Sequence, residues 1–96
     1  MQVIWSTRAI SSLVEIRAYI NIHFSVKEEE SFLQQVVDTL QFIKAFPKAF
    51  PACKNPKQAR KAVIHPHTTL FYSLKSKKRI ELLFFFDNRN NPKKLK

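Results

Sequence analysis

Glycine is missing from this sequence of 96 residues, and cysteine occurs once. Without glycine the chain cannot build a glycine-rich phosphate loop, which excludes the P-loop and dinucleotide-binding classes of nucleotide-binding protein. Any turn that needs a positive φ angle must use asparagine, aspartate, serine or lysine instead. The single cysteine, Cys53, has no partner for an internal disulfide, and we interpret it as a small apolar filler.

Long apolar runs are absent as well. The longest candidate, IELLFFF at 80–86, falls well short of the roughly 18 residues that a membrane-spanning helix needs. The opening MQVIWS has neither the basic flank nor the apolar run of a signal peptide, so we expect a cytoplasmic protein. A chain of 96 residues with 45% hydrophobic content predicts a single domain covering residues 1–96.

Acidic residues are scarce in the second half of the chain. Residues 1–50 hold five lysines and arginines against five acids, whereas residues 51–96 hold twelve against only Glu81 and Asp87. The net charge of +10 therefore belongs to one region. Such an asymmetry is typical of a protein that binds nucleic acid or an acidic protein. We expect the C-terminal cations to gather on one concave surface.

The first half of the sequence predicts a short strand and two helices. MQVIWS reads as a strand that ends at Ser6, which caps a helix over residues 7–24. A second helix follows a capping box formed by Ser25 and Glu28, and it ends before Pro47. The two helices are predicted to form an antiparallel hairpin. Their core-facing residues are predicted to be Ala9, Leu13, Ile16, Ile20 and Phe24, then Phe32 or Leu33, Val36, Val37, Leu40 and Ile43.

The second half predicts three strands after a proline-rich surface connection at 47–59. The segments ARKAVIH, HTTLFYSL and RIELLFFF have strand length and composition and are separated by short turns. We therefore predict an α+β fold with two layers in the order β-α-α-β-β-β, in which a twisted antiparallel sheet packs on the helical hairpin. The last strand is apolar at nearly every position, so we expect it to be central and covered on both faces, on one of them by a partner segment.

The ordered set of these segments resembles the RelE/ParE superfamily of bacterial type II toxins. The resemblance rests on VIWSTRAISSLVEIRAYI, RKAVI, HTTLFY and IELLFFFDNRNNPKKL, and it covers almost the whole chain. It implies a toxin domain that is neutralised by a cognate antitoxin protein. It also implies one of two targets: ribosome-bound messenger RNA, which RelE-like members cut, or DNA gyrase, which ParE-like members inhibit without catalysis. Neither activity implies a cofactor or a metal.

Metal-independent RNA cleavage needs cations on the phosphate and groups that exchange protons. Arg60, Lys61 and Arg89 are the candidate phosphate clamps. His67, His65 or a lysine with cationic neighbours is the candidate acid or base. By resemblance, Arg89 matches the phosphate-stabilising arginine after the last strand, and Arg60 or Lys61 matches the basic residues of the second strand.

Two features of the sequence differ from the RelE-like pattern. Thr69 stands where many RelE-like members have an arginine, and no tyrosine or histidine follows Arg89. The ending RNNPKKLK resembles the Arg-x-x-Pro ending of ParE-like sequences. The two targets therefore stay open, and a non-catalytic RNA-binding accessory domain is a third interpretation.

Several of these residues also have plain structural interpretations. His65 and His67 flank Pro66 and suit a solvated turn. Tyr72 alternates with Leu70 and Leu74, which favours a core position with its hydroxyl at the edge. Three lysines fall in a turn, at positions 75, 77 and 78, where they add general attraction for anions. Arg89 has a structural alternative as well, an ion pair with Asp87.

Overall fold

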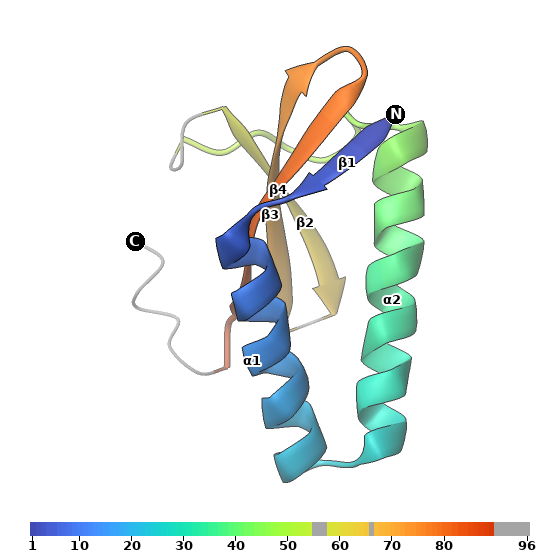
Figure 1. The fold of residues 1–96 in the computed structure, drawn as a ribbon, viewed down its shortest axis with the longest axis vertical. Helices are drawn as coiled ribbons and strands as arrows, with labels where there is room; N and C mark the ends of the chain where they lie inside the picture. Colours follow the sequence, from blue (N-terminus) through green and yellow to red (C-terminus); the bar gives the residue numbers. More distant parts are fainter. Residues whose placement is uncertain (55–57, 66, 90–96) are drawn as a thin grey trace.

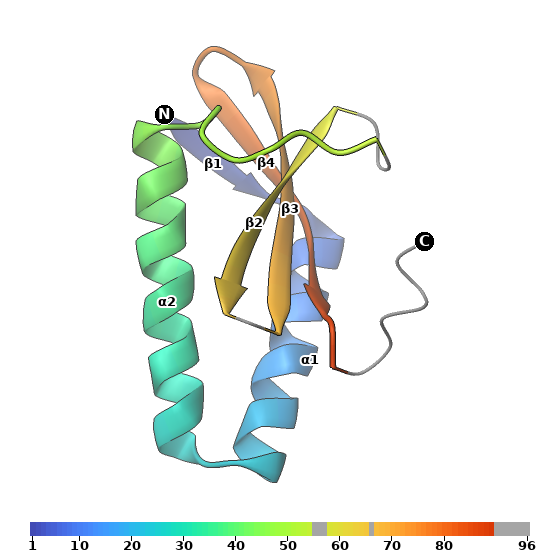
Figure 2. The ribbon, with the colours of Figure 1, turned by 180° about the vertical axis from the view of Figure 1, so that it is seen from behind.

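The described part of the chain forms two helices and one four-stranded sheet (Figure 1). The computed structural model describes residues 1–54, 58–65 and 67–89, and the side chain of His65 lies outside that description. The hairpin of the two helices lies along one side of the twisted sheet, which confirms the predicted two-layer α+β fold (Figures 1 and 2). In chain order the elements are β1 (Gln2–Trp5), α1 (Thr7–His23), α2 (Val26–Ala45), β2 (Ala59–His65), β3 (Thr68–Ser76) and β4 (Arg79–Asp87).

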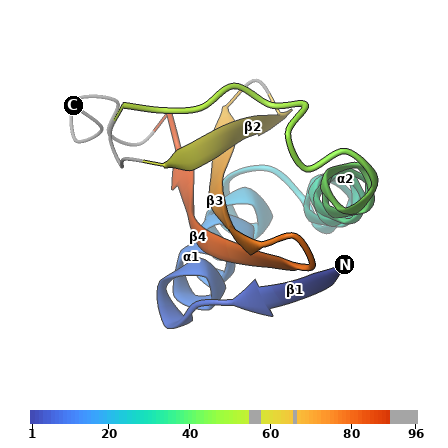
Figure 3. The same ribbon diagram turned by 90° about the horizontal axis from the view of Figure 1, so that it is seen from above.

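The strands lie in the order β1-β4-β3-β2, so β4 is central as predicted (Figure 3). β2, β3 and β4 form the predicted antiparallel meander. β1 instead pairs parallel with β4, from Gln2 opposite Arg79 to Trp5 opposite Leu82, so the sheet is mixed. Parallel neighbours need a long crossover, and the helices and two other strands between β1 and β4 supply it. No helix among the described residues is long and apolar enough to cross a membrane.

Both helices begin at the predicted serine caps. Ser25 Oγ accepts a hydrogen bond from the backbone N–H of Glu28 at 3.0 Å, which starts α2. Ser6 Oγ accepts from the N–H of Ala9 at 2.9 Å, which starts α1. α2 ends at Ala45, with the N–H of Phe46 bonded to the carbonyl of Phe42 at 2.8 Å, just before the proline that stops the helix.

The start of α1 is also bonded to the edge of β4 beyond the end of β1. Ser6 Oγ donates to the carbonyl of Leu83 at 2.8 Å, while its N–H donates to the carbonyl of Leu82 at 3.2 Å. Six residues further along the chain, Ser12 Oγ accepts from the N–H of Phe85 at 2.9 Å. Two serine hydroxyls therefore satisfy two of the backbone groups that the short strand β1 leaves unpaired, and they fix α1 against the central strand.

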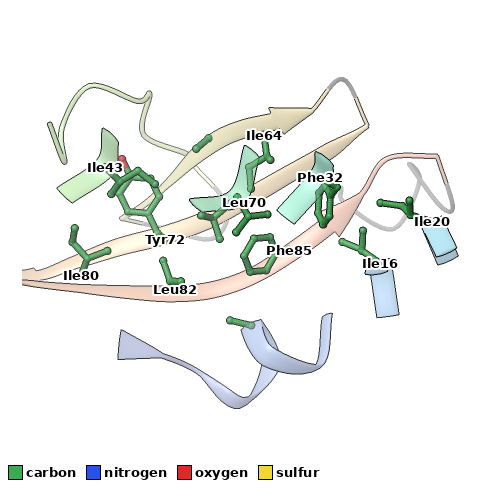
Figure 4. Packing of buried hydrophobic residues seen from close by; sticks show 13 residues of the cluster. Ile16, Ile20, Phe32, Ile43, Ile64, Leu70, Tyr72, Ile80, Leu82 and Phe85 are labelled. Atoms are coloured by element: carbon green, nitrogen blue, oxygen red, sulfur yellow. The ribbon is translucent and has the colours of Figure 1, made fainter. Parts of the chain in front are cut away.

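The main core lies between the hairpin and one face of the sheet (Figure 4). Tyr72 is fully buried there, and its hydroxyl donates to the carbonyl of Pro47 at 2.8 Å, as its alternation predicts. Burial raises the pKa of the Tyr72 hydroxyl, and the positive charge of Arg60 offsets part of that rise. The other large members are Ile16, Ile20, Phe32, Val36, Ile43, Ile64, Leu70, Ile80, Leu82 and Phe85.

Two residues predicted to face this core are exposed. Phe24 is 57% exposed, because it is the C-cap of α1, with φ −127° and ψ −91°, and does not continue the helical face. Val37 is 45% exposed, because it lies one residue, about 100°, around α2 from the buried Val36. The predictions for both residues are therefore wrong.

The opposite face of the sheet carries a smaller aromatic cluster. Phe71 and Phe84 are paired across β3 and β4 and stack with ring centroids 4.6 Å apart. The guanidinium carbon of Arg8, from the start of α1, lies 3.9 Å from the centre of the Phe84 ring. Phe84 is thus covered from within the chain, although the sequence predicted that a partner segment would cover this side of β4.

One residue in the described part of the chain, Gln58, has a positive φ, of 66°. Our expectation that such positions would be asparagine, aspartate, serine or lysine is wrong here. A left-handed conformation at a residue with a Cβ atom costs about 1 kcal/mol. Gln58 stands directly before β2, at the end of the proline-rich connection.

We expect Ser6→Ala to lower the free energy of unfolding by about 1.5 kcal/mol, because it removes both the cap of α1 and the bond to β4. Ser11→Ala is the matched control, since Ser11 is exposed and its hydroxyl donates to the carbonyl of Arg8 in its own helix at 3.3 Å. That variant is expected to change stability by less than about 0.5 kcal/mol. Urea denaturation followed by circular dichroism measures the free energy of unfolding of both variants. Equal losses of stability in the two variants would contradict a stabilising role for the Ser6 bonds between α1 and β4.

Candidate functional site

Arg89, the strongest sequence candidate, lies just past β4 in an ion pair with Asp87. Its Nε is 3.2 Å from Asp87 Oδ1 and its Nη2 is 3.3 Å from Oδ2, so the guanidinium and carboxylate meet side by side. The N–H of Arg89 also donates to Oδ1 at 3.0 Å. The Asp87 side chain is only 4% exposed and that of Arg89 is 21% exposed. The ion pair with Asp87, which the sequence offered as the structural interpretation of Arg89, is therefore present in the fold.

Two aromatic rings from the end of α1 complete the surroundings of Arg89. Its guanidinium carbon lies 5.0 Å from the centre of the Tyr19 ring and 5.4 Å from that of Phe24. Both distances fall within the range of cation–π attraction. The sequence did not predict this contact, because Tyr19 and Phe24 are remote from Arg89 along the chain and neither position has a distinctive spacing.

His67 and Arg89 line the same cleft, between the hairpin end of the helices and the start of β3. The cleft has a volume of about 160 Å³. The carbonyl of His67 accepts from the N–H of Asn88 at 2.6 Å, which ties the turn before β3 to the end of β4. The polar residues that line the cleft are Glu28, Ser31, Gln35, His67, Thr68 and Arg89.

Arg60 lies on the same face of the sheet as Tyr72 but toward the opposite end of β3 from this cleft. Its Nη1 donates to the carbonyl of Phe50 at 2.6 Å and to that of Lys48 at 3.3 Å. β2 pairs Arg60 with Tyr72, whereas Arg89 follows the Thr68 end of β3. The Arg60 guanidinium therefore holds the connection after α2 against the sheet.

Lys61 occupies the other face of the sheet. It is exposed and pairs with Phe71, on the side of the small aromatic cluster. Thr69 is also on this face and is 6% exposed. Because neighbouring residues of a strand point to opposite faces, Arg60 and Lys61 cannot act on one phosphate. Our expectation of a single cationic surface is wrong for this pair.

The lysines of the turn between β3 and β4 form a separate basic region. Lys75 pairs with Glu81 at 3.1 Å, while Lys77 and Lys78 are exposed. β4 separates this turn from Arg89 by roughly 30 Å at the usual rise per residue. Among the described residues, no three histidine, cysteine, aspartate or glutamate side chains gather as metal ligands would. Cys53 is half-buried.

The outer side of the hairpin holds a polar network that the sequence did not predict. Arg17 Nε donates to Glu29 Oε2 at 2.8 Å and Asn21 Nδ2 donates to Glu29 Oε1 at 2.9 Å. The bonds from Asn21 and then Arg17 lower the pKa of the Glu29 carboxyl. Since a lowered pKa favours the charged form in the fold, this contribution to stability is present near neutral pH and is lost as the pH falls through that pKa.

We expect Arg89→Ala to lower the free energy of unfolding by about 2 kcal/mol, because it leaves the buried Asp87 carboxylate without its partner. Arg79→Ala is the matched control, since Arg79 is exposed at the other end of β4, and it should change stability by less than about 0.5 kcal/mol. Urea denaturation measures both variants. Equal stability of the two would show that the ion pair contributes nothing to the fold.

Comparisons with known proteins agree with this architecture. Residues 3–92 match the family described as ParE toxin of type II toxin-antitoxin system, parDE. The chromosomal ParDE system of P. aeruginosa contains a chain that superposes with a TM-score of 0.74 at 14% identity, covering 91% of this chain and 95% of that one. The YoeB/ParE toxin from Agrobacterium tumefaciens superposes with a TM-score of 0.65 at 13% identity, covering 91% and 98%.

A third solved structure, YafQ from E. coli, gives a TM-score of 0.56 at 15% identity and covers 92% of this chain and 93% of that one. At these identities the superpositions show a shared fold only. No curated protein matches the sequence. The family match, in contrast, extends over nearly the whole chain. This chain therefore belongs to the ParE toxin family of type II toxin–antitoxin systems.

Proposed function

We propose that this toxin arrests growth by binding DNA gyrase and that it does so without cutting RNA. The supporting observation is that the candidate cationic side chains lie apart from one another and that two of them already bind other groups of the protein. The Arg60 guanidinium is bound to two backbone carbonyls, and that of Arg89 to a buried carboxylate. Lys61 lies on the opposite face of the sheet. A phosphate in a cleavage transition state needs its cations and its acid and base within contact distance at one point.

RelE-like cleavage of ribosome-bound messenger RNA is the second candidate. The observation that favours it is the cleft that both His67 and Arg89 line. An RNA-binding accessory domain without toxicity is the third candidate, and its support is the basic second half of the chain. The first two candidates make different predictions for substitutions at His67 and Lys61, whereas the third predicts no growth arrest even by the unchanged protein.

We expect His67→Ala and Lys61→Ala to arrest growth as strongly as the unchanged toxin when expression is induced. A protein that acts by binding has no need of their proton transfer or phosphate contact. A ribonuclease that used them would lose activity by a factor of about 100 or more. Colony counts after induction, normalised to protein level, measure the outcome. A loss of arrest in either variant, with the fold intact, would overturn the proposal.

The toxin's cognate antitoxin is proposed to cover the outer face of α1. Ile10, Val14 and Ile22 are 52%, 57% and 76% exposed, and Ala18 between them is exposed as well. Their spacing of four residues places them in one ridge along the helix. An exposed apolar ridge of this length is typical of an interface, and an amphipathic partner segment buries it well.

We expect the double substitution Val14→Gln and Ile22→Gln to weaken antitoxin binding at least about tenfold, because two apolar anchors are lost from the interface. Val63→Gln is the matched control, since Val63 is 62% exposed but lies on β2. Isothermal titration with the purified cognate antitoxin measures the affinities. Equal affinity for the double variant and the control would exclude the α1 ridge as the docking face.

A further inference from the structure

The turn between β3 and β4 exposes five residues in succession, and four of them are lysine or arginine. Lys75 is paired with Glu81 at 3.1 Å. The other three, Lys77, Lys78 and Arg79, form no ion pair within the described part of the chain, and we call them the turn cluster. Three consecutive positive charges therefore face solvent at one end of the sheet.

The geometry of the turn does not require lysine at its tip. Ser76 pairs with Arg79, so Lys77 and Lys78 form a two-residue tip. The Ser76 hydroxyl accepts from the N–H of Lys78 at 3.3 Å, and neither tip residue has a positive φ. Asparagine, aspartate or serine would suit such a turn at least as well. Two like charges about 7 Å apart in water repel by roughly 0.6 kcal/mol, so the fold alone does not explain the lysine pair.

The turn cluster lies far from the acidic residues that begin α2. Glu28, Glu29 and Glu30 stand at the start of this helix, next to the link between the two helices. The β3–β4 turn lies at the other end of the molecule, on the side where α2 ends, and α2 is roughly 30 Å long (Figure 1). An extended polyanion is therefore attracted more strongly to the turn than to the linked end of the helices.

The composition of the turn favours a phosphate backbone over an acidic protein. Residues 75–79 contain no apolar or aromatic side chain that could anchor a protein partner. Lysine is also depleted from protein–protein interfaces. Contacts with phosphates need only compact, flexible point charges, which lysine provides. The turn also lacks the aromatic rings on which proteins stack the bases of a single strand, so a duplex fits it better.

We propose that the turn cluster binds the phosphate backbone of duplex DNA. Lys77, Lys78 and Arg79 each contact one phosphate and read no base, so the binding does not depend on DNA sequence. The site is roughly 30 Å from Arg89 along β4, and it is separate from the apolar ridge on α1. It goes beyond the proposed function, because it gives the toxin a ligand other than gyrase and the antitoxin.

Fluorescence anisotropy with a labelled DNA duplex of arbitrary sequence tests the site on the purified chain. We expect a dissociation constant on the order of 1–100 μM near physiological salt. Each phosphate contact releases condensed counterions, so the affinity falls as salt rises. Three contacts predict a slope of about −2.7 for the logarithm of the association constant against the logarithm of the salt concentration.

Two double variants locate the contact. Lys77→Ser with Lys78→Ser should weaken binding at least about tenfold and bring the slope to about −0.9, because one phosphate contact remains. Lys27→Ser with Lys61→Ser is the matched control, since it removes the same charge from two exposed positions outside the turn. Its affinity should change less than about twofold, because salt screens distant charges. Both variants should melt like the unchanged chain, since all four side chains are exposed.

Three results would overturn the proposal. The first is no measurable duplex binding, or a slope flatter than about −1 for the unchanged chain. The second is equal affinity of the two double variants for the duplex. The third is tighter binding of poly-glutamate or of single-stranded DNA than of the duplex, which would assign the turn to an acidic protein or to a single strand. Gyrase is in none of these assays, so their failure leaves the proposed function to its own test.

Discussion

The bonds between the start of α1 and the edge of β4 determine how the rest of this small protein is arranged. β1 is only four residues long and leaves the second half of β4 without a neighbour on that side. The hydroxyls of Ser6 and Ser12 supply the missing partners, at 2.8 and 2.9 Å. Because α1 is held there, Arg8 covers Phe84 and the far end of the helix reaches Arg89.

The same placement gives the chain its cleft. The C-cap of α1 brings Phe24 beside Arg89, and the tight link to α2 brings Glu28 and Gln35 to the facing wall. Arg89 thus serves the fold through its pair with Asp87 and contributes to the wall of the cleft at the same time.

The fold was predictable from the sequence because its signals are local. Serine caps, a proline stop and strand-forming runs gave the six elements and their order, and the apolar last strand gave its central position. The parallel pairing of β1 was not predictable, since its own residues do not indicate which strand it joins. The candidate site was harder to predict than the fold. Arg60 and Lys61 are neighbours in sequence yet lie on opposite faces of the sheet. Tyr19 contacts Arg89 although the two residues are seventy positions apart in the sequence.

The central proposal is that this ParE family member acts on DNA gyrase by binding and does not cut RNA. The most direct measurement adds the purified protein to two reactions in parallel, relaxed plasmid with DNA gyrase and ATP, and a defined message on translating ribosomes. We predict that supercoiling is blocked at stoichiometric toxin while primer extension reads the message as full length. Uninhibited supercoiling together with new message ends inside the reading frame would contradict this account.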